Sequence, residues 1–311
     1  MSDPTTVTGG AEGGGPLPAT PVARRGTGRL RNGRLTLVPA FLWWAVFLVT
    51  PIALVLVSSF FRRGPFGGVV YEFTLDNYVR AINPLFLGVL WYSVRVALIT
   101  TVICLLIGYP AAYFIATRSS ARLRNALLVL VVLPFLTNFL IRTYAWIVLL
   151  NREGVVNKAL QGLGIVDAPI PLLYNDFAVI MGLTYGYLPL MILPLYAAIE
   201  RLSPAVREAA EDLGARPLRI LRTVTIPLIL PGIVAGCVFV FVPSLGNFPV
   251  PQLLGGGKRI MIGNVVNQQF LEARDWPFGS TLALMLMAIL MVLLVVQSRA
   301  LRRSREIGLD A

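Results

Sequence analysis

The sequence predicts an all-α polytopic membrane protein with six spanning helices. Of the 311 residues, 56% are hydrophobic and only 14% are charged, and the mean hydropathy is +0.75. Soluble domains carry roughly a quarter charged residues, so this composition is typical of a chain that lies in a bilayer. A spanning helix needs about 20 mostly apolar residues, and several uncharged runs reach that length. These runs are Leu35–Phe61, Val96–Thr117, Phe177–Ile199, Thr223–Gly257 and Pro277–Ser298.

The chain is expected to divide into two tails, a first span, a loop and a main membrane domain. The first 34 residues are polar and rich in Gly and Pro, without an early apolar core. They are interpreted as a disordered cytoplasmic tail rather than a cleaved signal. The first span is expected at residues 35–61 and an extracytoplasmic loop at 62–88. The main membrane domain is expected at 89–299 and a second cytoplasmic tail at 300–311.

Two spans need further argument. The third is expected from about Asn125 to Leu150, although Arg142 interrupts its apolar run. The run Thr223–Gly257 is too long for one helix. Its second half is rich in Pro and Gly from Pro243 onward, which indicates a helix end followed by a loop.

Basic residues set the expected orientation, because cytoplasmic loops carry an excess of Arg and Lys. The two tails and the loops around 118–124 and 201–222 together hold 17 arginines, whereas the other side holds 8 basic residues. Both termini and the loop at 201–222 are therefore expected in the cytoplasm. The net charge of +12 follows largely from this bias, and no nucleic-acid-binding motif accompanies it.

Absent residues exclude several kinds of chemistry. The chain has no histidine, which removes the common zinc motifs and the Ser-His-Asp triad. The glycines before Lys258 lack the spacing of a nucleotide-binding P-loop, so the chain is expected not to hydrolyse ATP itself. Cys104 and Cys237 both lie inside expected spans and are interpreted as small packing residues, with a disulfide or a metal pair as the alternative.

A charged module interrupts the apolar pattern between the fourth and fifth spans. Ser203 and Pro204 are typical of a helix start, and Glu208 and Asp212 lie one turn apart on one helical face. Gly214 permits a tight turn, and arginines follow it at every third position. The pattern predicts a helix, a turn and a second helix. A solvated interfacial helix with no partner is the alternative.

The spacing of this module resembles the coupling loop of permeases from ATP-binding-cassette importers. That loop has the pattern E-A-A, three residues, G, nine residues, I-x-L-P, and Glu208, Ala209, Ala210, Gly214 and Pro227 fall at its fixed positions. The resemblance implies that the helix carrying Glu208 and Asp212 fits a cleft of an ATPase subunit. Closure of the ATPase dimer would then move the spanning helices as rigid bodies.

Other segments extend the resemblance over about Leu35 to Arg303, to the B-type permeases of spermidine/putrescine importers. It implies the type I importer (MetI-like) fold in a bacterial cytoplasmic membrane, with the coupling loop at 203–227. It also implies a second similar permease, an ATPase dimer that binds ATP and Mg²⁺, an extracytoplasmic polyamine-binding protein and no cofactor on this chain. The segments are Phe73–Tyr78, Gly108–Pro110, Pro134–Tyr144, Ile262–Val265 and Arg274–Gly279.

Candidate substrate-path or receptor-docking residues lie near the expected outer side. A polyamine is a flexible polycation, which carboxylates and aromatic faces recognise. Asp176 opens the fourth span, Asp275 and Trp276 precede the sixth, and Tyr144 and Tyr185 lie near helix ends or within spans. The alternative for the aromatic residues is an interfacial belt with helix packing, and for Asp275 it is a helix-start contact.

Arg142 is the most unusual single residue of the spans. An arginine inside a span costs about 2.5–3.5 kcal/mol unless it pairs or reaches the interface. A cation repels a polyamine, so Arg142 is not interpreted as a ligand. With Asn138 one turn before it, it is expected to pair with a loop carboxylate or to contact a partner protein. A residue that reaches the outer interface is the alternative.

The hypothesis from the sequence is a permease subunit of a polyamine importer, driven by a separate ATPase through residues 208–227. The same fold also serves importers of iron, thiamine and sulfate, so another solute is the first alternative. A stand-alone secondary transporter is the second. It is disfavoured because no obvious carboxylate lies at mid-membrane, where such transporters usually carry one.

Overall fold

The computed structural model describes residues 39, 41–118 and 120–307. Contacts divide the chain into two units, residues 1–51 and 52–311, and each is described by itself. The expected tail at 1–34 and the last residues, 308–311, of the expected tail at 300–311 lie outside the described residues. The first unit contains the π-helical turn η2 (Ala45–Val49), and α2 (Thr50–Ser58) begins at its end.

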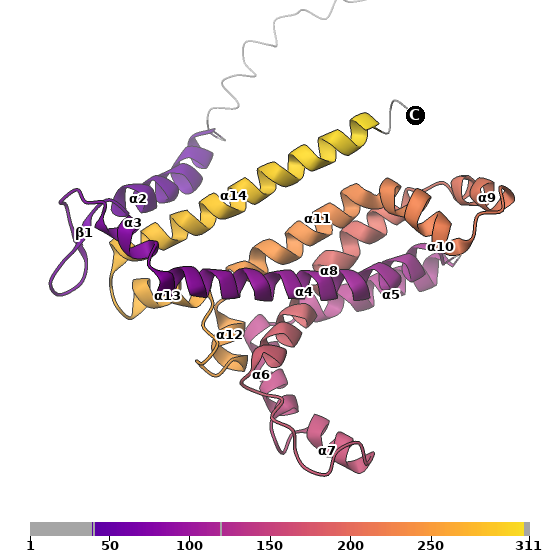
Figure 1. Ribbon diagram of the computed structural model, residues 1–311, viewed down its shortest axis with the longest axis horizontal. Helices are drawn as coiled ribbons and strands as arrows, with labels where there is room; N and C mark the ends of the chain where they lie inside the picture. Colours follow the sequence, from indigo (N-terminus) through magenta and orange to yellow (C-terminus); the bar gives the residue numbers. More distant parts are fainter. Residues whose placement is uncertain (1–38, 40, 119, 308–311) are drawn as a thin grey trace, which may run out of the picture. The chain divides into compact units, whose positions relative to one another are not determined.

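The second unit is helical apart from one small hairpin. Across the described residues, five helices are long and apolar enough to cross a membrane, or six if one bent pair counts as a span. The elements after α2 are β1 (Arg62–Arg63), β2 (Val69–Val70), α3 (Asp76–Ala81), α4 (Pro84–Ala116), α5 (Ala121–Leu136), α6 (Phe139–Leu150), α7 (Val155–Gly162), α8 (Asp176–Glu200), α9 (Pro204–Asp212), α10 (Pro217–Ile220), η3 (Leu221–Thr225), α11 (Ile226–Leu245), α12 (Pro249–Leu254), α13 (Ile262–Leu271) and α14 (Trp276–Ile307) (Figure 1).

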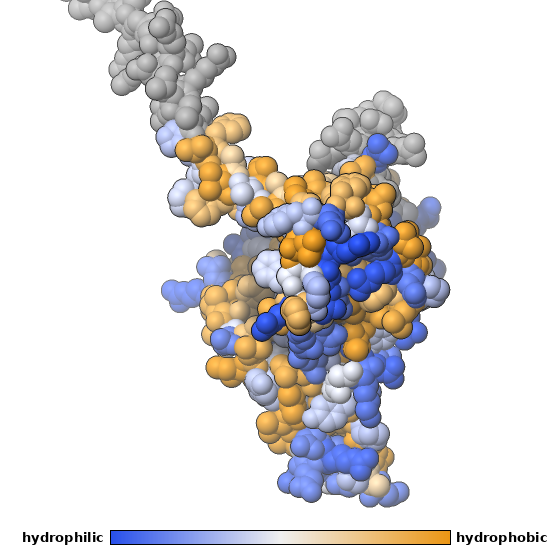
Figure 2. Space-filling model, turned by 90° about the vertical axis from the view of Figure 1, so that its left-hand side faces the viewer, coloured by the Kyte–Doolittle hydropathy of each residue, from blue (hydrophilic) through white to orange (hydrophobic). Residues whose placement is uncertain are grey.

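The segment expected as a plain loop at 62–88 has structure of its own. The antiparallel strands β1 and β2 form a hairpin, and α4 begins at Pro84, where the Asn83 side chain accepts a hydrogen bond from the Leu85 N–H at 3.0 Å. The buried Asn77 of α3 donates to the carbonyls of Ser59 and Phe61, which holds this segment together. Figure 2 looks onto this end of the unit and shows hydrophilic residues gathered within a largely hydrophobic surface.

The third expected span is not one continuous helix. α5 and the stretch Phe139–Gly162, which contains α6 and α7, are bent by 90° at the break between Leu136 and Phe139. Pro134 lies in the last turn of α5, and Thr137 takes an extended conformation, after which Asn138 starts the next helix. The span expected from Asn125 to Leu150 is therefore a bent pair of helices, with a new helix cap in its middle.

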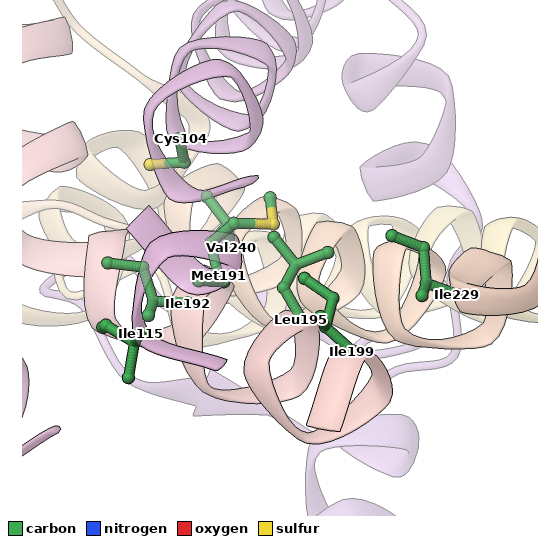
Figure 3. Packing of buried hydrophobic residues seen from close by; sticks show 9 residues of the cluster. Cys104, Ile115, Met191, Ile192, Leu195, Ile199, Ile229 and Val240 are labelled. Atoms are coloured by element: carbon green, nitrogen blue, oxygen red, sulfur yellow. The ribbon is translucent and has the colours of Figure 1, made fainter. Parts of the chain in front are cut away.

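The core of the second unit is formed by α4, α8 and α11, which run side by side (Figure 1). Met191 and Leu195 of α8 are fully buried and pack with residues of α4 and α11 (Figure 3). Gly236 of α11 allows this contact, because a Cβ at that position would lie 2.7 Å from the Met191 Sδ. Small residues let helix backbones approach closely in a membrane, where packing rather than water exclusion drives association. Cys104 packs in this core, and neither it nor Cys237 forms a disulfide.

Candidate functional site

The helix α9 occupies the loop in which the sequence predicts a coupling element. It begins at Pro204, directly after Ser203, whose backbone is extended (ψ 128°) as expected of an N-cap. The Ser203 side chain makes no capping hydrogen bond to a described residue. Proline at the first helical position needs no backbone donor and presets the helical φ, so it supports this start. The predicted start is confirmed by the backbone and does not depend on the serine hydroxyl.

The end of α9 is a complete Schellman turn built around Gly214. The Gly214 N–H donates to the Glu211 carbonyl at 2.8 Å, and the Ala215 N–H donates to the Ala210 carbonyl at 3.1 Å. Gly214 has φ +75°, a conformation that a residue with a Cβ disfavours. Nothing lies within 4 Å of a Cβ built there, so the backbone conformation rather than space requires glycine. The turn expected at this glycine is confirmed.

Charged and small side chains of the loop are presented outward together. Glu208, Glu211 and Asp212 of α9 are exposed, Ala209 is exposed beside them, and Ala210 is partly buried. Small residues allow a partner surface to approach the helix closely, while the acidic side chains can pair with basic groups on it. The residues that continue the pattern beyond the turn are basic and also exposed: Arg216, Arg219 and Arg222.

The second half of the loop passes into a spanning helix without a break. The helical run Pro217–Leu245 is one of the candidate spans, and it contains α10, η3 and α11. Pro227 has no N–H to donate to the preceding turn, and the π-helical turn η3 lies directly before it, with the Ile226 N–H donating to the Leu221 carbonyl. α10, η3 and α11 therefore form one continuous helical run.

Asp176 lies at the opposite end of α8 from α9, in an ionic cluster that joins three segments. Its carboxylate accepts hydrogen bonds from the Tyr92 hydroxyl at 2.9 Å and the Arg95 guanidinium at 3.4 Å, both on α4. Arg259, in the loop after α12, lies 3.0 Å from the same carboxylate. The Asp176 side chain keeps 31% of its surface exposed, so it is paired with arginines and still accessible to solvent.

Asp275 is in a different environment and has a structural contact. Its side chain is 1% exposed and pairs with Arg80 of α3 at 3.1 Å. The second carboxylate oxygen accepts a hydrogen bond from the Phe278 N–H at 3.1 Å, as an N-terminal cap of α14 does. Trp276 beside it is half exposed and packs edge-on against Phe270 of α13. This geometry favours the helix-start interpretation of Asp275.

Arg142 lies at the bend between α5 and α6. Its guanidinium donates to the Pro134 carbonyl at 2.7 Å, a group at the end of α5 that also accepts from the Thr137 hydroxyl at 2.6 Å. It also faces the Tyr185 ring at 5.7 Å, and no carboxylate among the described residues lies within ion-pair distance. Asn138 caps α6 by accepting from the Leu140 N–H at 2.9 Å.

The structure brings some of the predicted outer residues together and separates others. Asn138, Arg142 and Tyr185 share the bend, where Tyr185 also packs edge-on against Trp146 at 5.4 Å. Tyr144 is exposed, at 55%, and has no described ring contact. No described hydrogen bond, ion pair or ring contact joins this group to Asp176 or Asp275.

Sequence reasoning missed the arginines that pair with these carboxylates. In the sequence, these residues are seen only as charges near the ends of spans, and their partners are not evident. They are Arg80, Arg95 and Arg259. A further pair, Arg124 with Glu200, lies at the end of α8 near α9. The signal in the sequence that could have predicted these ion pairs is the presence of opposite charges at the ends of different spans.

Comparison with known proteins agrees with this geometry. The family described as binding-protein-dependent transport system inner membrane component matches residues 105–305. The spermidine/putrescine transport system permease protein PotB of Escherichia coli (strain K12) is 43% identical over 260 residues, which cover 84% of this chain and 94% of that protein. The protein of the same name from Haemophilus influenzae is 44% identical over 267 residues, or 86% and 93% of the two chains.

A solved structure shows the same fold at lower identity. The crystal structure of a bacterial ABC transporter involved in the import of the acidic polysaccharide alginate aligns with a TM-score of 0.69 and 20% identity. The alignment covers 88% of this chain and 96% of that chain. At this identity the similarity concerns the fold alone.

Proposed function

This chain belongs to the family of binding-protein-dependent transport system inner membrane components, and from that premise we propose that it is the permease of an ATP-driven polyamine importer. The observation that carries the substrate is the 43–44% identity, over 84–86% of the chain, to relatives named spermidine/putrescine permeases. The expected substrates are spermidine and putrescine. A permease of the same fold for iron, thiamine or sulfate is the alternative.

The energy source is a separate ATPase dimer that docks on α9 and binds the ATP and Mg²⁺. The exposed Glu208, Ala209 and Asp212 supply a charged helix with small side chains, and the Schellman turn at Gly214 sets its direction. Because α9 continues from α8 and leads through α10 into α11, force applied to it enters two of the three core helices.

The proposed orientation places α9 and both termini in the cytoplasm, following the basic residues of the loops. The opposite end, with β1, α3 and α13, then faces the outside, where an extracytoplasmic polyamine-binding protein delivers the substrate (Figure 1). A second permease completes the pathway. Among the expected cation-recognising groups, Tyr144 keeps an exposed aromatic face, whereas Asp176 is paired with Arg95 and Arg259 and would have to exchange them for the substrate.

The substrate assignment is tested by uptake of radiolabelled spermidine and putrescine in a strain that lacks this chain and every other polyamine importer. We expect uptake to disappear and to return with the unmodified chain. Uptake that is unchanged in the deletion strain would overturn the assignment.

The coupling assignment is tested by Glu208→Arg, which reverses an exposed charge on α9. Like charges placed against each other at an interface cost several kcal/mol, so we expect co-purification of the ATPase to fall on the order of tenfold or more. Glu153→Arg makes the same change at an exposed position before α7 and serves as the matched control. Transport by the purified chain without any ATPase would instead support a stand-alone transporter.

A further inference from the structure

The coupling helix α9 is separated from the ends of the spanning helices by a cavity. The cavity has a volume of about 310 Å³ and lies between Thr117 just after α4, Val206 of α9 and Leu228 of α11. The side chains described on α9 are exposed or partly buried, and none is fully buried. The helix therefore moves the membrane domain mainly through its two chain connections and less through side-chain packing.

One ion pair lies in the wall of this cavity, at the first of those connections. The Arg124 guanidinium of α5 lies 3.4 Å from the carboxylate of Glu200, the last residue of α8. Both side chains are partly exposed, at 33% and 42%, and both line the cavity. Only Arg201, Leu202 and Ser203 separate Glu200 from the start of α9.

The Arg124–Glu200 ion pair contacts α5, a helix to which α9 has no direct chain connection. α9 follows α8 in the chain and leads through α10 into α11. α5 instead follows α4 after the short segment 117–120, and three helices separate it from α9 in the chain. α5 ends at the bend after Leu136, beside which Arg142 donates to the Pro134 carbonyl. A contact between Arg124 and Glu200 therefore links movement of α9 to the bent third span.

We propose that Arg124 and Glu200 are positioning residues that transmit the movement of α9 to α5, so that ATP hydrolysis is coupled to substrate passage. This inference rests on the proposed function, because it requires an ATPase that acts on α9. Neither residue is assigned a contact with the substrate. Loss of the pair should leave the complex able to hydrolyse ATP but less able to convert hydrolysis into uptake.

The experiment uses the complete transporter in lipid vesicles and measures uptake and ATP hydrolysis in the same sample. Arg124→Gln, Glu200→Gln and the double variant form a cycle. The exchange R124E/E200R restores the opposite charges in reversed positions. Arg122→Gln is the matched control, since Arg122 lies on the same helix, is exposed and forms no ion pair with a described residue.

We expect each single neutral variant to lower uptake per ATP by about 2- to 30-fold, the range found for residues that carry coupling between sites. In the double variant, uptake per ATP should fall no further than in the more impaired single variant. The charge exchange should recover most of this ratio, and Arg122→Gln should leave it unchanged. Multiplied losses in the double variant, or an unchanged ratio in the single variants, would overturn the proposal. If instead the unmodified complex shows ATP hydrolysis but takes up no polyamine, the substrate assignment fails. The ratio can then be measured with the solute that the complex does carry.

Discussion

Replacing Gly232 by alanine should separate α11 from α8. A Cβ at this position would overlap the Ala198 Cβ and lie 2.9 Å from the Pro194 carbonyl oxygen, closer than real Cβ atoms approach. A backbone oxygen cannot rotate away as a long side chain can, so the two helices must move apart. Overpacking of this kind costs about 1–3 kcal/mol. The change adds one methyl group, but it falls in the core formed by α4, α8 and α11.

The matched control is Gly88→Ala in α4. Gly88 is exposed, and nothing lies within 4 Å of a Cβ built there. Alanine should be neutral or stabilise the helix by about 0.5–1 kcal/mol, since glycine loses more backbone entropy.

Thermal unfolding in detergent, followed by tryptophan fluorescence, compares the two variants. At about 2–4 °C per kcal/mol for a domain of this size, Gly232→Ala should lower Tm by about 2–12 °C while Gly88→Ala does not lower it. Equal Tm values for both variants would refute the close packing of α8 on α11.

Three further predictions concern caps and turns. Gly214→Ala should cost about 1–2 kcal/mol in the turn after α9, because φ is positive there, and should lower uptake without lowering the amount of chain in the membrane. Asp275→Ala should lower Tm, since it removes a cap contribution of about 0.5–2 kcal/mol and leaves Arg80 unpaired, and Asp275→Asn should retain part of the cap. Asn138→Ala should destabilise the start of α6 by about 0.5–2 kcal/mol, which protease accessibility at the α5–α6 bend would detect, and an unchanged digestion rate would contradict it.

Much of the fold could be predicted from the sequence because the bilayer imposes a simple length rule. Uncharged runs such as Phe177–Ile199 correspond closely to the observed α8. The turn after α9 could also be predicted, because glycine takes the positive φ of Gly214 at little energetic cost. Both features depend on residues that are close together in the chain.

The ion pairs could not be predicted, because they depend on residues far apart in the chain. Arg80 and Asp275 are 195 positions apart, and a single sequence does not show which of many arginines pairs with which carboxylate. The bend in the third span lies beside Pro134, but membrane helices tolerate proline, so the residue type alone does not show that a new helix begins there. The sequence places Asn138 one turn before Arg142, whereas the structure shows that its side chain caps α6.

Photocrosslinking from α9 tests the central claim, that an ATPase drives this chain through its coupling helix. A photoreactive amino acid placed at Leu213, which is 89% exposed at the end of α9, should form an adduct with the ATPase subunit in the assembled transporter. The same probe at Leu163, which is 74% exposed after α7, should form none. An ATPase adduct from Leu163 and none from Leu213, or modification of Leu213→Cys by a membrane-impermeant reagent added outside intact cells, would contradict the account.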